Sequence, residues 1–298
     1  MESTAPPVSK GRHLRARVVK TLRPAAFLTG PMAVLALFFL APLIILLIMS
    51  FRYESLYGFQ TGWTLDNFRA LFTDPIYRGV AKDTLIIAST AMVCQLLVAF
   101  PLSYFIAFKA GRWELPLLLL LVLVDELNPI VRIYAWRMLL GREGLINDFL
   151  IWTGIIDVPL DWLLFTKFSV ILVLSTSWVN YCALPIYASM KAIKPSLFEA
   201  ATDLGAGWIT RWRRILIPLA APGIFVAIIL VYIPLFTDFA TPGLVGGTSS
   251  YMLGNSVADL MVVIGDWGAG SALSLLMLAA MAVVAVIAYF LTKLNQLD

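Results

Sequence analysis

The chain has 298 residues, of which 60% are hydrophobic and only 13% are charged, and its formal net charge is +4. About 25% of the residues of a soluble domain are charged, so a chain with half that share cannot cover a water-facing surface. The composition therefore excludes a soluble globular protein. It predicts an all-α membrane protein with several spans, since each helical span takes roughly 20 apolar residues.

Histidine and cysteine are too few for the common catalytic and metal sites. The single histidine, His13, lies in the polar N-terminal tail, which excludes a histidine-based triad or a histidine-ligated metal within the membrane. Cys94 and Cys182 lie inside apolar runs without a CxxC motif, so we expect packed side chains rather than a disulfide or a metal site. The basic residues flank apolar runs, which argues against a nucleic-acid partner.

Six apolar stretches follow a basic tail at residues 1–26. The first stretch is too long for a signal peptide and lacks a cleavage site after it, so we expect it to remain as the first span. The third stretch is irregular, because charged residues and Pro129 interrupt its second half. The six predicted spans are 27–49, 84–108, 115–140, 168–190, 220–237 and 272–291, within one membrane domain at 27–298.

The basic residues predict the orientation of these spans. Six spans place both termini on one side, and the tail, the loops after the second and fourth spans and the C-terminus together carry 14 lysine and arginine residues. The loops on the other side carry six. The positive-inside rule therefore predicts that both termini lie in the cytoplasm.

Two outer loops carry apolar residues at helical spacing. In the stretch 64–72 these residues follow Asp66, which we expect to cap a short helix. The stretch 144–156 repeats the pattern. We interpret both as amphipathic helices on the outer surface, serving either as lids over the helix ends or as docking sites.

The inner loop 191–218 is the most informative part of the chain. Ser196 and Glu199 have the spacing of a capping box, Pro195 blocks extension of the helix backwards, and Gly205 suits a left-handed C-terminal cap. We therefore expect a helix of two turns, a glycine corner and a second helix leading into the fifth span. Such a short helix could sit in a groove on another protein and pass that protein's motion to two spans. Its apolar contact would be formed by Leu197, Phe198, Ala201 and Leu204.

At these residues the sequence resembles the EAA loop of binding-protein-dependent ABC importer permeases. The match consists of Glu199-Ala200-Ala201, three residues, Gly205, nine residues and Ile215-Leu216-Ile217-Pro218. Ile217 stands where the family usually has leucine. The resemblance implies that residues 197–201, Leu204 and Gly205 couple the chain to an ATPase. A purely local capping role for Glu199 is the alternative.

Other segments resemble the spermidine/putrescine branch of this family, namely LDNFRALFTDP, RIYAW, DFATPGLVGG, GN and DW. The resemblance implies a type I importer fold in the bacterial inner membrane. It also implies a second permease subunit, a pair of ATPase subunits and a periplasmic or lipid-anchored solute-binding protein. The motif GxxxxGK[ST] does not occur in these residues. We therefore expect a non-catalytic subunit with no cofactor of its own, whose ATPase partner binds ATP and magnesium.

Ionisable residues within spans are costly and usually face a cavity. The candidates for the substrate pathway are the charged residues Asp125, Glu126, Arg132 and Asp238 and the aromatic residues Tyr134, Trp136 and Trp178. A polyamine could pair with the carboxylates and lie against the aromatic rings. The structural alternative is that Asp125 and Arg132, seven residues apart on one helix face, pair with water between them or interact with a partner helix. The acidic pair at 125–126 departs from the polyamine-permease pattern, so opines, other amines and other small organic solutes stay open.

The stretch 242–254 is rich in glycine, threonine and serine and lacks basic residues. We predict a periplasmic gate there, with a plain extracellular turn as the alternative. Two other classes of protein are alternatives for the whole chain. A secondary transporter normally has inverted repeats and more spans, and an intramembrane protease is disfavoured by the lone histidine in the tail. The leading prediction is an importer permease that works by alternating access.

Overall fold

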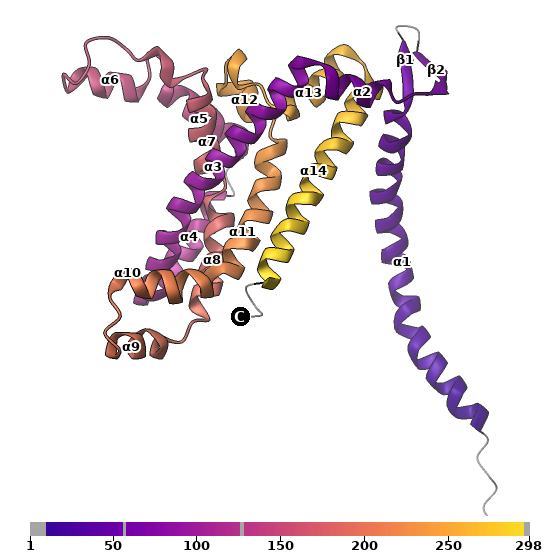
Figure 1. Cartoon of the computed structure of the whole chain (residues 1–298), viewed down its shortest axis with the longest axis horizontal. Coiled ribbons are helices and arrows are strands. Elements are labelled where there is room, and N and C mark those ends of the chain that lie inside the picture. The colour runs from indigo at the N-terminus through magenta and orange to yellow at the C-terminus, as the bar shows by residue number, and fades with distance from the viewer. Residues whose placement is uncertain (1–9, 56–57, 126–127, 295–298) are drawn as a thin grey trace, which may run out of the picture.

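The computed structural model describes residues 10–55, 58–125 and 128–294, and helices dominate these residues (Figure 1). The helices are α1 (Lys10–Ser50), α2 (Asp66–Thr73), α3 (Pro75–Phe108), α4 (Glu114–Asp125), α5 (Pro129–Leu140), α6 (Leu145–Trp152), α7 (Lys167–Ser177), α8 (Val179–Lys191), α9 (Pro195–Asp203), α10 (Trp208–Arg211), α11 (Ile217–Thr237), α12 (Ala240–Val245), α13 (Leu253–Ala258) and α14 (Trp267–Leu294). The strands are β1 (Arg52–Ser55) and β2 (Gly58–Trp63). Two π-helical turns, Trp212–Leu216 and Asp259–Ile264, follow α10 and α13.

Four of the described helices are long and apolar enough to cross a membrane. They contain the segments Thr29–Ser50, Pro75–Phe108, Trp208–Thr237 and Trp267–Phe290. The helices α7 and α8 form a fifth candidate span that is bent by 44°. The predicted count of six is therefore not reached by uninterrupted helices in the described residues.

The predicted third span is divided into α4 and α5, each of 12 residues. Pro129 occupies the first turn of α5, and the Asn128 side chain caps this helix by accepting a hydrogen bond from the Ile130 amide at 2.9 Å. Proline lacks an amide hydrogen and its fixed φ suits the first turn of a helix, so Pro129 favours the start of a new helix at this position. The expectation that Asp125 and Arg132 share one helix face is therefore wrong, because they lie on different helices.

The fourth span breaks at Trp178, between α7 and α8. The last carbonyls of α7 then have no partner within their helix, which is costly away from water. The buried side chain of Gln95, on α3, donates to the Leu174 carbonyl at 2.5 Å. A second bond joins α3 to α8, where the Ser103 hydroxyl donates to the Ala183 carbonyl at 2.8 Å. Side chains of α3 thus stabilise the broken span.

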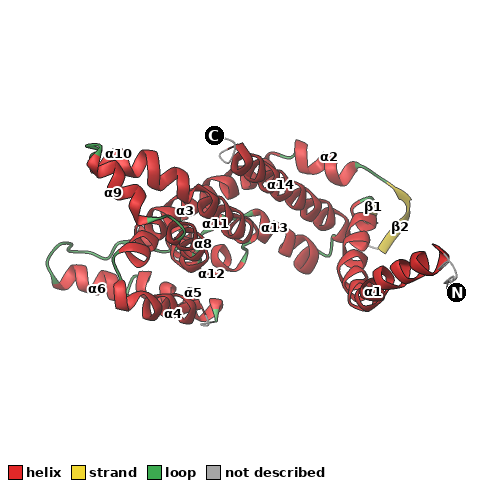
Figure 2. Cartoon of the chain, turned by 90° about the horizontal axis from the view of Figure 1, so that it is seen from below, coloured by secondary structure: helices red, strands yellow, loops and turns green. Residues whose placement is uncertain are grey.

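The helix α8 packs against both α3 and α11, and Figure 2 shows these three clustered at the centre of the bundle. The contact with α11 is close because Gly223 has no side chain. A Cβ atom there would lie 2.4 Å from the Pro185 carbonyl oxygen and 2.5 Å from the Ser189 hydroxyl. Small residues allow such close approach between helices in membranes.

The two predicted outer helices are present as α2 and α6. The predicted cap is wrong, however, because Leu65 is the N-cap of α2 and Asp66 is its first residue. The antiparallel hairpin β1–β2 was not predicted. The Asn67 side chain holds it to α2 by donating to the carbonyls of Ser50 and Arg52, at 2.9 and 3.0 Å.

The first helix stands apart from the bundle along much of its length (Figure 1). It begins at Lys10, so the described part of the predicted tail 1–26 continues directly into the first span. No residue of the most apolar window in Thr29–Ser50 is buried, although α1 does contact α14. The apolar side chains of that window therefore face the surroundings of the chain.

Candidate coupling helix and translocation pathway

The helix α9 lies at the end of the bundle where α14 ends, within the loop 191–218 (Figure 1). It begins with Pro195 at its first helical position, and its N-cap residue Lys194 makes no side-chain capping bond. The predicted capping box is therefore wrong. Proline suits the first helical position, so the helix begins one residue before Ser196. Ser196 thus lies inside the first turn, where its hydroxyl cannot serve as the N-cap acceptor for Glu199.

The other end of α9 is as predicted. Gly205 has a φ of +75°, the left-handed conformation that favours glycine. Its amide donates to the Thr202 carbonyl, and the Ala206 amide donates to the Ala201 carbonyl, both at 2.9 Å. These two bonds form a Schellman motif, which satisfies the last carbonyls of a helix and turns the chain sharply.

The side chains of α9 divide between two surfaces. Phe198, predicted as part of a contact with another protein, is half-buried and packs against Phe108 of α3, with ring centroids 5.5 Å apart. Leu204 and Leu197 point outward and are 88% and 46% exposed. Glu199 and Ala200 are also exposed, and Ala201 is half-buried.

An aromatic cluster that was not predicted ties α9 and α10 to α3. The ring of Trp212 lies 5.0 Å from Tyr104, 5.7 Å from Phe100 and 4.8 Å from Trp208, measured between centroids. Arg211 adds a hydrogen bond of 2.8 Å from its guanidinium to the Thr202 hydroxyl. These contacts, together with the packing of Phe198 on Phe108, hold α9 and α10 against α3.

Three of the predicted pathway residues meet in one pocket of ≈ 280 Å³. Arg132 comes from α5, Trp178 from the bend between α7 and α8, and Asp238 from the end of α11. Pro129 and Pro234 also line it, so the pocket lies where three spans are interrupted or contain proline. Non-helical backbone at membrane depth is tolerated where protein or a water-filled cavity surrounds it.

Asp238 has a structural role in this pocket as well. Its carboxylate accepts hydrogen bonds from the Thr241 amide at 3.0 Å and from the Thr241 hydroxyl at 2.8 Å. These bonds hold the start of α12 against the end of α11. Trp178 lies beside Tyr181, with ring centroids 5.3 Å apart.

Tyr134 and Trp136 do not line this pocket. Tyr134 is 48% exposed on α5, and Trp136 is half-buried against the core. Asp125 is the last residue of α4. Glu126 lies outside the described residues.

The predicted gate 242–254 is a packed segment, and the alternative of a plain extracellular turn is wrong. The Val245 carbonyl accepts bonds from the Ser169 hydroxyl at 2.7 Å and from the Phe165 amide at 3.0 Å. The Leu253 amide donates to the Thr84 hydroxyl at 2.9 Å. The segment is therefore fixed to α3 and α7.

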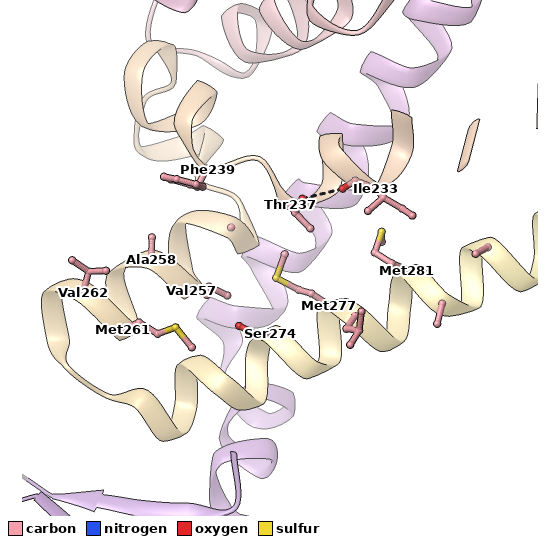
Figure 3. Close-up of a pocket in the computed structure, with 14 residues that line it drawn as sticks. Ile233, Thr237, Phe239, Val257, Ala258, Met261, Val262, Ser274, Met277 and Met281 are labelled. Atoms are coloured by element: carbon pink, nitrogen blue, oxygen red, sulfur yellow. Dashed lines mark hydrogen bonds between the residues drawn. The ribbon is translucent and has the colours of Figure 1, made fainter. Parts of the chain in front are cut away.

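A larger apolar pocket of ≈ 660 Å³ lies between α11, the α13 segment and α14 (Figure 3). Three methionines line it, Met261, Met277 and Met281. It shares Thr237 and Phe239 with the pocket of Asp238, so the two spaces are neighbours. No local sequence signal indicated this pocket, because its walls come from segments distant in the chain.

The model of the family described as binding-protein-dependent transport system inner membrane component matches residues 18–296. The chain belongs to this family. It is thus the permease subunit of an ABC importer and a multi-pass protein of the inner membrane. Permeases of this kind are non-catalytic subunits.

Two relatives of this permease have similar sequences over most of its length. The spermidine/putrescine transport system permease protein PotB of Escherichia coli (strain K12) is 36% identical over 214 residues, which cover 72% of this chain and 77% of the relative. PotB of Haemophilus influenzae is 31% identical over 263 residues, which cover 87% of this chain and 91% of the relative.

The permease also has the fold of a solved importer. A chain from the crystal structure of a bacterial ABC transporter that imports the acidic polysaccharide alginate aligns with a TM-score of 0.76. The alignment covers 94% of this permease and 98% of that chain, at 18% sequence identity. At this identity the likeness concerns the fold.

Proposed function

We propose that this permease forms, with a second permease subunit, the pathway of an ATP-driven importer for polyamines or a related small organic amine. The observation that carries the proposal is the pocket in which the Asp238 carboxylate and the Trp178 ring lie together, where the spans are interrupted. A carboxylate pairs with an ammonium group, and an indole face attracts a cation. The PotB relatives, whose names specify spermidine and putrescine, support the same substrate class.

The proposed orientation has six spans and both termini in the cytoplasm. In it, α4 with α5 forms one broken span and α7 with α8 forms another. Two helices of 12 residues rise about 18 Å each at 1.5 Å per residue. Together they suffice for a hydrocarbon core about 30 Å thick.

The helix α9 is the proposed coupling element. Its exposed Leu197 and Leu204 would dock on the ATPase subunits, which bind ATP and magnesium. Closure of the ATPase pair would displace α9, and the aromatic cluster around Trp212 would pass this displacement to α3 and α11. The pathway would then open to the outside and accept solute from a periplasmic or lipid-anchored binding protein. The packed segment 242–254 would serve as the gate.

The second candidate is an importer for an opine or an amino-acid-like solute. Arg132 lines the same pocket as Asp238, and this cation favours a solute that also carries a carboxylate. The amine candidate requires the negative charge of Asp238, whereas the opine candidate also requires the positive charge of Arg132.

A secondary transporter would need no ATPase subunit. Solute uptake by reconstituted vesicles in the absence of ATP would reveal such a transporter.

Replacing Asp238 with asparagine tests the amine substrate directly. Asparagine keeps one oxygen that can accept the bond from the Thr241 amide, and its NH₂ group can donate to the Thr241 hydroxyl, but the negative charge is removed. We expect uptake of labelled putrescine and spermidine to weaken on the order of tenfold, the effect of losing a hydrogen bond to a charged group. Trp178→Leu should weaken it similarly, whereas the exposed Tyr134→Phe should change nothing. Unchanged polyamine uptake in both pocket variants would contradict the proposal.

The orientation is tested with two single cysteine substitutions at exposed positions. Leu204 on α9 is 88% exposed and Trp152 on α6 is 82% exposed, at opposite ends of the bundle (Figure 1). A membrane-impermeant thiol reagent should label Trp152→Cys in intact cells and Leu204→Cys only after permeabilisation. Cys182 is buried and Cys94 is half-buried, so the unmodified chain provides the background. Labelling of Leu204→Cys in intact cells would reverse the orientation.

A further inference from the structure

A third cavity, of ≈ 550 Å³, lies between α3, α9 and α10. Its walls combine several aromatic rings with two cationic side chains. The residues that carry the argument are Tyr104, Lys109, Glu199, Trp208, Arg211 and Trp212. The proposed coupling uses the rings for packing and one bond of Arg211, but it gives no role to the cavity itself or to Lys109.

The position of the cavity relative to the bilayer follows from helix lengths. The helix α11 has 21 residues, which rise about 32 Å at 1.5 Å per residue. It therefore spans a hydrocarbon core about 30 Å thick by itself. Trp208 and Trp212 precede α11 and so lie at the headgroup level, and Lys109 directly follows the inner end of α3. Tryptophan and tyrosine are enriched at this level of a membrane.

The two cations of the cavity lack acidic partners. Within the residues that the structure describes, neither Lys109 nor Arg211 forms an ion pair within 4.0 Å. Glu199 lines the same cavity but is exposed, and it does not reach either of them at that distance. The guanidinium of Arg211 donates one bond to the hydroxyl of Thr202, which is neutral and does not pair with its charge.

We propose that this cavity binds the headgroup of an anionic phospholipid, with its phosphate held by Lys109 and Arg211. Arginine and lysine are the usual phosphate ligands, and basic pockets between helices on the cytoplasmic side bind acidic headgroups. Tyr104, Trp208 and Trp212 would surround the glycerol region. The acyl chains would lie along the exposed side of α3, where Leu97 and Phe105 are 70% and 50% exposed.

The proposed orientation decides only which leaflet supplies the lipid, and the lipid site rests on the proposed function in that respect alone. The test is native mass spectrometry of the assembled transporter purified from vesicles of phosphatidylcholine and phosphatidylglycerol. Each basic residue near a membrane surface contributes about 1 kcal/mol to the binding of anionic lipid. Retention of phosphatidylglycerol should therefore fall roughly fivefold in Lys109→Gln and about thirtyfold in Lys109→Gln/Arg211→Gln.

The matched control is Arg213→Gln/Arg214→Gln. It removes two exposed cations from the adjacent π-helical turn, and neither of them lines the cavity. Retention in this variant should stay close to that of the unmodified chain. Lys109→Gln makes the test independent of folding, because its side chain has no hydrogen bond or ion pair in the described structure.

Two results would overturn the lipid site. Equal losses of phosphatidylglycerol in the cavity variants and in the control would show that the lipid is retained by the general positive charge of the surface and not by this cavity. Displacement of the lipid by inorganic phosphate would assign the cavity to a soluble phosphate compound. Cysteine labelling of Leu204→Cys reports the orientation separately, so failure of the lipid site and failure of the proposed topology are distinguishable.

Discussion

Gly205→Val is expected to leave the permease in the membrane but to abolish most substrate uptake per ATP hydrolysed. Gly205 has a φ of +75°, and a left-handed conformation costs an L-residue roughly 1–2 kcal/mol, with β-branched residues among the worst. A side chain at this position would meet no atom within 4 Å. The substitution is therefore expected to act through the backbone, by destabilising the left-handed conformation that the Schellman motif requires. The end of α9 should therefore unwind and its docking surface should be lost.

The measurement is a reconstituted transporter assayed for uptake and ATP hydrolysis together. We expect the ratio of solute to ATP to fall by on the order of tenfold while hydrolysis persists, since about 1.4 kcal/mol corresponds to a factor of ten. Gly207→Val is the matched control. Gly207 lies two residues away with equally open space, but its φ of −64° suits valine. Full coupling in Gly205→Val would contradict the role of α9.

Gly223→Ala is expected to destabilise the whole bundle. The added Cβ would lie 2.4 Å from the Pro185 carbonyl oxygen, which belongs to the backbone of a helix packed between α3 and α11. Overpacking of a filled core typically costs 1–3 kcal/mol and here the obstructing atom cannot rotate away. The midpoint of thermal unfolding in detergent should fall, and Gly223→Leu should fail to accumulate in the membrane.

Gly79→Ala is the control for this effect. Gly79 also lies within a helix, α3, but a Cβ there would meet no atom within 4 Å. Alanine is a better helix former than glycine by up to about 1 kcal/mol. The control should therefore keep or raise the unfolding midpoint. A lowered midpoint in both variants would show that loss of glycine, rather than the contact with Pro185, is responsible.

Gly205 and Gly223 differ in whether their roles can be predicted from the sequence. Gly205 was predicted as a left-handed cap because the signal is local, a glycine that follows a short run of helix formers. Gly223 gave no such signal, because its importance depends on Pro185, which lies 38 positions earlier in the chain. The capping box at Ser196 had the right local pattern, but Pro195 took the first helical position.

Composition and hydropathy alone determined the membrane class, because a chain with so few charges cannot be covered by water. Proline chemistry determined where α5 begins, and the spaced pattern of the loop 191–218 indicated the family. Tertiary structure decided that Arg132, Trp178 and Asp238 share a pocket while Tyr134 and Trp136 do not. It also decided that Phe198 faces α3. The physical reason is that periodicity orients a side chain relative to its own helix, whereas the neighbour that it meets depends on how separate helices pack.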